Sequence, residues 1–262
     1  MQFVHSLKPR IEVKLAMKWT VIGYWGAYPE KGEATTAYLL EDQGFRLLID
    51  CGSGALAQLQ KYAAITDIDA LILSHYHHDH IADVGPLQYA RDIAKYLGGS
   101  AKPLPIYAHE MEPDKFKALD YNDATHAVSY KIGEPIEIGP FRLDFIRTVH
   151  PAPCAAMRIT NGKRTIAYTA DTSYIPELVP LSKEADLLVA ECSLYKDQDG
   201  APMGHMNSLD VGRLAKEAGV REVLLTHLPH YGRHEDLVNE TATVFEGKIS
   251  LAKSGWTWEA AE

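Results

Sequence analysis

The 262-residue sequence predicts an α/β fold in a single domain, preceded by a short extension. Apolar segments typical of strands alternate with segments of helical periodicity in both halves of the chain. No linker or low-complexity tract interrupts this alternation, so residues 17–262 are expected to form a single domain. Residues 1–16 are charged throughout and lack the apolar core of a secretory signal, so they are expected to form an irregular extension.

The first half is expected to build strands around a buried central one. Residues 68–73 are almost continuously apolar and stop at Ser74 and His75, which is typical of a central strand that delivers polar residues at its carboxyl end. Residues 42–44 (DQG) are expected to close a hairpin. The strands expected here are 19–23, 37–40, 45–50, 68–73 and 104–107, and the helices are 55–62, 84–97 and 113–119.

The second half repeats this alternation. Gly139 and Pro140 mark one hairpin turn, and Asn161 with Gly162 is a strong signal for another. Asn207 or Ser208 is expected to cap a helix that runs to Ala218. The strands expected here are 136–138, 141–149, 154–160, 165–169, 185–190, 222–225 and 248–252, and a last helix is expected at 235–245.

Composition limits the function classes. A net charge of −9 without clustered basic residues disfavours an extended nucleic-acid surface, although a small phosphorylated substrate stays compatible if bound cations supply positive charge. Three widely spaced cysteines without a CxxC motif are expected to be reduced core residues: Cys51, Cys154 and Cys192. No apolar run approaches the roughly 20 residues of a membrane span, so a cytoplasmic protein without membrane contact is expected.

The most informative segment is HYHHDH, residues 75–80. Imidazole and carboxylate are the ligands of zinc sites that keep a reactive water, whereas closed structural sites use cysteine thiolates. In an extended strand end, His75 and His77 project to the same side, while Asp79 and His80 in the following turn can reach a second ion. A fortuitous surface cluster is disfavoured because a buried strand precedes the segment and a helix follows it.

Here the sequence resembles the metallo-β-lactamase superfamily, whose HxHxDH signature these residues match. The resemblance implies an αββα sandwich, with two mixed β-sheets between outer helix layers. It also implies a hydrolase that uses a hydroxide held by two divalent ions, since His77 stands where the oxygen-reducing diiron branch has an acidic residue. The implied ligands are His75, His77 and His150 for one ion, Asp79, His80 and His227 for the other, and Asp171 bridging both.

Further residues are similar to the phosphodiesterase branch that contains ribonuclease Z and the cyclic-phosphate phosphodiesterases. In that branch the histidine corresponding to His205 (GHMNS) is the acid for the leaving group, and an acidic residue corresponds to Glu191. We expect Glu191 to orient His205 and Asp79 to help position the attacking water. The resemblance thus implies cleavage of a small or cyclic phosphodiester or of an RNA end.

Several alternatives remain open at this point. The same ligands support thioester or lactone hydrolysis, and a non-catalytic metal-binding protein is a remote third class. The tRNA-processing endonuclease ribonuclease Z is disfavoured, because only residues 151–170 stand where that family inserts a long RNA-binding arm. Zinc is the expected metal, manganese or iron would also fit, and relatives in this branch are often homodimers.

The other histidines are not expected to be catalytic. His78 lies between ligands, and His5, His109 and His126 are expected to be solvated. His230 and His234 follow His227 in a loop, where either one could line the mouth of the site with Tyr231 or simply pack. The loop 23–32 could likewise flank the site or only turn.

Overall fold

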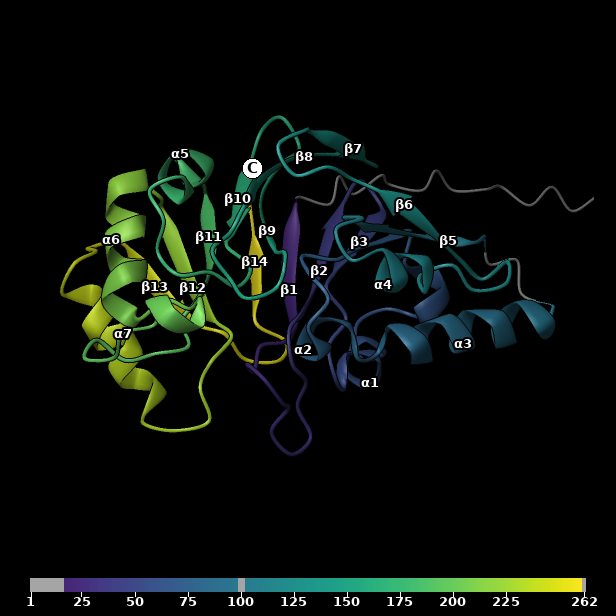
Figure 1. Cartoon of the computed structure of the whole chain (residues 1–262), viewed down its shortest axis with the longest axis horizontal. Coiled ribbons are helices and arrows are strands. Elements are labelled where there is room, and N and C mark those ends of the chain that lie inside the picture. The colour runs from purple at the N-terminus through teal and green to yellow at the C-terminus, as the bar shows by residue number, and fades with distance from the viewer. Residues whose placement is uncertain (1–16, 99–101, 261–262) are drawn as a thin grey trace, which may run out of the picture.

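The computed structural model describes residues 17–98 and 102–260, so the predicted extension at 1–16 lies outside the described part of the chain. Two seven-stranded sheets lie face to face, and helices cover the outer face of each (Figure 1). This arrangement confirms the α/β class and the sandwich of two mixed sheets between helix layers. No helix in the described ranges is both long and apolar enough to cross a membrane.

The first sheet has the order β14-β1-β2-β3-β4-β5-β6. Its first strands are antiparallel, and β3 to β6 run parallel to one another. The strands are β1 (Lys18–Gly23), β2 (Ala37–Asp42), β3 (Phe45–Ile49), β4 (Ala70–Ile72), β5 (Leu104–Ala108), β6 (Thr125–Ser129) and β14 (Thr257–Glu259).

The second sheet has the order β13-β12-β11-β10-β9-β8-β7. Here β7 to β10 are antiparallel neighbours, and β10 to β13 are parallel. The strands are β7 (Ile136–Ile138), β8 (Phe141–Arg147), β9 (Ala155–Thr160), β10 (Thr165–Tyr168), β11 (Leu187–Glu191), β12 (Glu222–Thr226) and β13 (Lys248–Leu251).

Three apolar layers hold the sandwich together. The central layer, between the sheets, joins Trp19 and Tyr38 from the first sheet to Phe141 and Tyr168 from the second. One outer layer packs the first sheet under its helices, and the other packs the second sheet under its own. The helices are α1 (Ala55–Leu59), α2 (His78–Ile81), α3 (Val84–Tyr96), α4 (Pro113–Lys117), α5 (Leu178–Ser182), α6 (Ser208–Ala218) and α7 (His234–Ala242), with 3₁₀ turns at Ile65–Asp67 and Ala201–Met203.

Several local predictions are confirmed. Asn207 caps α6, because its side chain accepts from the backbone N–H groups of Leu209 and Asp210, and the Asp210 side chain bonds back to complete a capping box. All three cysteines are buried and free, as expected for core residues.

Other elements differ from the prediction. The segment that holds Asp79 and His80 is the one-turn helix α2 rather than a turn, and β4 ends at Ile72, short of the histidines. The short elements β6, β14 and α5 were not predicted. The edge strand β6 shows little apolar alternation, and β14 is stabilised by its pairing with β1. Pro180 argues against a helix at α5, but it lies in the first turn, where proline is tolerated.

The parallel strands place polar residues at one edge of the sandwich. The first-sheet strands β3 and β4 lead into Asp50 and His75, and the second-sheet strands β10 and β12 lead into Asp171 and His227. Because neighbouring parallel strands end at the same edge, residues far apart in sequence converge there. Asp50 and His227 have φ of 55° and 53°, a left-handed conformation that turns the chain sharply at the strand end.

Candidate metal centre

The seven predicted ligands lie together around the Asp171 carboxylate. Its Oδ2 atom is 3.4 Å from both His80 Nε2 and His227 Nε2, 3.7 Å from His75 Nε2 and 3.8 Å from His150 Nε2. Four imidazoles from three segments of the chain therefore face one carboxylate oxygen. This is the geometry expected of a bridging ligand between two cations.

The donor atoms divide into two groups that share Asp171, and within each group all atoms lie within 4.8 Å of one another. Each group contains enough nitrogen and oxygen donors to hold one divalent ion. The first group is His75, His77, His150 and Asp171, and the second is Asp79, His80, Asp171 and His227.

Unpaired buried atoms show that these residues fit cations. His75 Nε2, His80 Nε2 and Asp171 Oδ1 are buried without a hydrogen-bond partner among the described residues. His150 Nε2 also faces His77 Nδ1 at 3.0 Å. Leaving buried polar atoms unpaired costs about 1–3 kcal/mol each. A pair of divalent ions would satisfy all of them, so the donor set matches the chemistry of a dinuclear site.

A buried aspartate that the sequence prediction missed holds His80 in place. Asp50 is 0% exposed and accepts from His80 Nδ1 at 2.9 Å, from the Ser74 backbone N–H at 2.7 Å and from the Tyr168 hydroxyl at 2.9 Å. A carboxylate on Nδ1 leaves Nε2 as the ligand atom and makes it more basic. Burial opposes protonation of His80, but the surrounding carboxylates, Asp171 foremost, raise its pKa above the ordinary value, which shows how strongly this site attracts positive charge.

Two other ligand rings, those of His150 and His227, are also oriented through their second nitrogen. His150 Nδ1 donates to the Gly204 carbonyl at 3.1 Å, and His227 Nδ1 lies 2.9 Å from Ser193 Oγ. Gly204 has φ 74°, and a side chain there would collide with the backbone of His150. The loop before α6 is therefore packed directly against a candidate ligand.

His205 and Glu191 form a hydrogen-bonded pair beside the ligands. His205 Nδ1 lies 2.9 Å from Glu191 Oε1, and the buried Glu191 carboxylate also accepts the Thr172 N–H at 2.9 Å. Burial alone would lower the pKa of His205, but the Glu191 carboxylate outweighs it and raises that pKa to about 9. The His205 ring lies 5.2 Å from the ring of His150 and 5.5 Å from that of His227. It can thus deliver a proton next to the candidate centre.

The loop between β1 and β2 lies over the second group of ligands. The Ala27 N–H donates to Asp79 Oδ2 at 2.8 Å. Next to it, Trp25, His230 and Tyr28 form a three-ring stack. The centroid of the His230 ring lies 4.6 Å from that of Trp25 and 3.7 Å from that of Tyr28. Tyr28, at the outer end, is 58% exposed. The loop therefore flanks the site, and His230 packs inside this stack.

The other histidines have varied positions. His78 and His126 are exposed, as predicted, and His5 lies outside the described ranges. The prediction for His109 is wrong, because this residue is 2% exposed. Its Nε2 donates to the Pro153 carbonyl, and its ring meets the edge of Tyr76. His234 donates to the Pro229 carbonyl and begins α7, so it is a packing residue.

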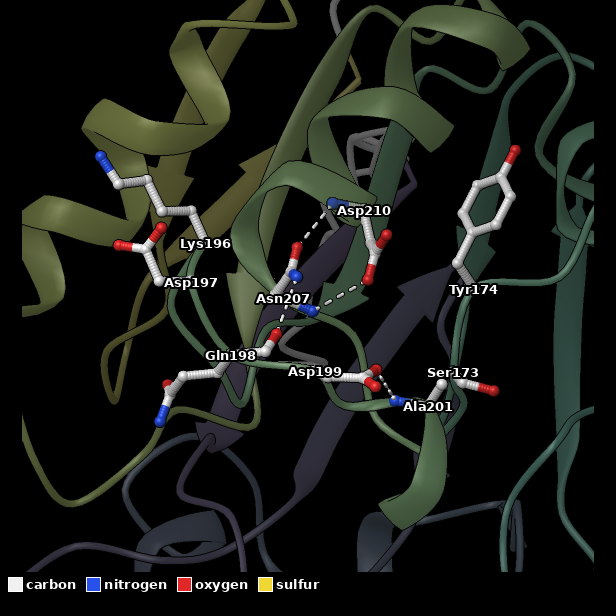
Figure 2. A pocket seen from close by; sticks show the side chains of 9 residues that line it. All are labelled: Ser173, Tyr174, Lys196, Asp197, Gln198, Asp199, Ala201, Asn207 and Asp210. Atoms are coloured by element: carbon white, nitrogen blue, oxygen red, sulfur yellow. Dashed lines mark hydrogen bonds between the residues drawn. The ribbon is translucent and has the colours of Figure 1, made fainter.

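A cavity of about 490 Å³ lies between residues 196–201 and the start of α6, at Asn207 and Asp210 (Figure 2). Its lining includes Asp199 and Asp210, whose carboxylates accept backbone N–H groups, and none of the seven candidate ligands. The predicted reaction centre is therefore not in this cavity.

Comparisons with known proteins agree with this geometry. Residues 45–228 match the model of the beta-lactamase superfamily domain. The probable metallo-hydrolase YhfI of Bacillus subtilis is 51% identical over 243 residues, which cover 93% of this chain and 100% of that protein. Its crystal structure superposes with a TM-score of 0.93 at 50% identity and covers 94% of this chain and 100% of that one. Ribonuclease Z of Methanopyrus kandleri is 28% identical, covering 89% of this chain and 94% of that protein.

Proposed function

Because this chain belongs to the beta-lactamase superfamily, we propose that it is a metal-dependent hydrolase that cleaves phosphodiester bonds. One observation carries the choice of bond. The Glu191–His205 pair stands beside the seven candidate metal ligands, where it can protonate a leaving oxygen. The similarity to a probable metallo-hydrolase and to ribonuclease Z supports the same reaction class.

We assign the two ions to the two donor groups that share Asp171. Zinc is the expected metal for nitrogen-rich sites, and manganese or iron would fit the same donors. Two bound divalent ions would lower the pKa of a water molecule towards neutrality and offset the negative charge on the phosphate oxygens.

The protein side chains then have separate roles. Asp79, held by the Ala27 N–H, faces the reaction centre and helps orient the attacking water. His205 carries the proton that the departing alkoxide needs, and Glu191 keeps that imidazole protonated and correctly turned. Removing the side chain of His205 or of Glu191 should slow the chemical step rather than weaken metal binding.

A small or cyclic phosphodiester or an accessible RNA end suits the structure best. Residues 151–170 form the compact pair of strands β9 and β10, so no arm projects between His150 and Asp171 to hold a large RNA. The net charge of −9 also disfavours a long polyanion. Processing of tRNA by an arm-dependent mechanism is therefore the less favoured alternative.

The decisive experiment compares substrates at measured metal content. We expect protein with two ions per chain to hydrolyse bis(p-nitrophenyl) phosphate faster than a thioester or a lactone, and to lose this activity on chelation. A preference for the thioester or lactone would keep the fold and refute the phosphodiesterase assignment. Metal-replete protein inert on all three would favour a non-catalytic metal-binding protein.

Two further proposals concern the setting of the protein. The three buried, free cysteines support the expected cytoplasmic location, since a reducing compartment keeps thiols unpaired. The homodimer implied by family resemblance is tested by light scattering of the purified protein, which should give twice the chain mass of 29.1 kDa.

A further inference from the structure

Ser193 lies between the acid pair and a metal ligand. Its Oγ atom is 2.8 Å from Glu191 Oε2, 2.9 Å from His227 Nδ1 and 3.1 Å from the His227 carbonyl oxygen. The residue follows the last residue of β11 by two positions, and β11 pairs with β12, whose end leads into His227. The hydroxyl is therefore held by two adjacent strand ends.

The direction of these hydrogen bonds follows from the number of available protons. A hydroxyl donates one hydrogen and accepts up to two, whereas an ionised carboxylate can only accept. Glu191 Oε2 has Ser193 as its one hydrogen-bond donor within the described part of the chain, and Glu191 is 1% exposed. If Ser193 donated to His227 instead, a buried carboxylate oxygen would remain unpaired. Ser193 therefore donates to Glu191 and accepts from His227 Nδ1–H.

This direction determines which nitrogen of His227 is available to a metal. In the metal-free chain His227 Nε2 donates to Asp79 Oδ2 at 3.1 Å and lies 3.4 Å from Asp171 Oδ2, so with the Nδ1 proton held by Ser193 it is the Nε2 proton that a cation would displace. Nε2 is thus presented to the second group of ligands. The carbonyl of His227 is a poorer alternative acceptor for the serine proton, because it is farther away and uncharged.

The Glu191 carboxylate does not contact His227 directly and so cannot orient its ring without the serine. Its Oε1 atom already accepts from His205 Nδ1 and from the Thr172 N–H, and only Oε2 is left to face the serine. The hydroxyl extends the carboxylate by one hydrogen bond to reach His227. By contrast, His80 contacts the Asp50 carboxylate directly. One buried carboxylate thereby orients both the acid and a ligand of the second ion.

We propose that Ser193 is a positioning residue that fixes the Nδ1–H tautomer of His227 and so raises the affinity of the second metal site. The inference rests on the proposed function, since it takes His227 as a metal ligand. It makes Glu191, His205, Ser193 and His227 one continuous hydrogen-bonded unit. Loss of the Ser193 hydroxyl weakens binding of the ion at the second site and leaves the first site intact.

The test uses two variants of nearly identical shape. Ser193→Thr keeps the hydroxyl, and Ser193→Val replaces it with a methyl group at the same partly exposed position. Competition with a fluorescent chelator measures the affinity for each Zn²⁺ ion. We expect Ser193→Val to bind one of the two ions about 10–100-fold more weakly, the usual effect of losing a partner that orients a ligand, and Ser193→Thr to bind both ions as the wild type does.

A second readout does not depend on metal or activity. Long-range ¹H–¹⁵N spectra of the metal-free protein, recorded over a pH series that reaches the neutral form of the ring, report the protonated nitrogen of each histidine, and His227→Gln identifies the His227 signal. We expect Nδ1 protonation of His227 to decrease in Ser193→Val and to persist in Ser193→Thr. If the valine variant does not fold, as judged by circular dichroism, Ser193→Ala takes its place in both measurements.

The outcomes separate two failures. Wild-type protein that binds fewer than two ions would contradict the proposed function, whatever the serine does. Wild-type protein that binds two ions, together with a folded Ser193→Val variant of unchanged affinity at both sites, would overturn the inference and leave the proposed function in place.

Discussion

Replacement of His205 by alanine tests the proposed acid most directly when the leaving group is varied. An alkoxide leaving group needs a proton as the bond to phosphorus breaks, whereas p-nitrophenolate is stable without one. The substitution should therefore slow hydrolysis of an alkyl or nucleoside phosphodiester far more than that of an aryl one. A defect of folding or metal binding would slow both equally.

The structure indicates the size of the effect. Glu191 lies 2.9 Å from His205 and, with the metal site empty, raises its pKa to about 9, which favours the protonated imidazole at pH 7. The full contribution of a general acid, about 10²–10⁴-fold, is then available and is lost in the alanine variant. This corresponds to about 3–5 kcal/mol of transition-state stabilisation for the alkyl substrate. For the aryl substrate we expect a decrease of less than about tenfold.

The assay measures kcat/KM for both substrates at pH 7, with metal content determined on the same samples. Phosphate release is followed for the alkyl substrate with a coupled phosphomonoesterase, and absorbance for the aryl one. Equal losses on both substrates, at two ions per chain, would refute the acid role of His205. An unchanged rate on the alkyl substrate would refute it equally.

Three further results are expected. Glu191→Gln removes the charge that favours the imidazolium, so the pKa of His205 falls and the alkaline limb of the profile of kcat/KM against pH moves to lower pH; an unmoved limb would contradict this role. Asp50→Asn leaves buried donors poorly paired and should lower the free energy of unfolding of metal-free protein in urea by about 2–5 kcal/mol, against less than about 0.5 kcal/mol for the exposed control Asp123→Asn. Tyr28→Ala removes the outer ring of the aromatic stack and should raise KM for an aryl phosphodiester about two- to tenfold, while Tyr28→Phe keeps it; equal KM values for both variants would show that the ring does not touch substrate.

The sequence could predict that the candidate ligands lie together, because their signal is local. His75, His150, Asp171 and His227 each follow an apolar strand, and strand ends meet at one edge whatever the length of the connections. The strands and helices with clear periodicity were predicted to within a few residues for the same reason. The sequence can therefore predict which polar residues lie at the strand ends, because this depends only on residue type and on position relative to the strands.

The missed residues depend on contacts that sequence does not encode locally. Asp50, which ends the segment LLID, looks like an ordinary turn residue until Tyr168 and His80 surround it. Ser193 gains its importance from a strand neighbour 34 positions away. His109 was wrongly expected in solvent, because the Pro153 carbonyl and Tyr76 that bury it come from other segments. Long-range packing decides each of these cases.

The last strand, β14, has a consequence for how the protein is made. Every other strand of the first sheet lies in the first half of the chain, but β14 returns from the second half and pairs with β1, joining Lys18 to Glu259 and Thr20 to Thr257 (Figure 1). During synthesis the edge of β1 stays uncovered until residues 257–259 leave the ribosome. An open strand edge is a template for pairing with another chain. Nascent chains shortened before residue 257 should therefore aggregate, even though they contain every candidate catalytic residue.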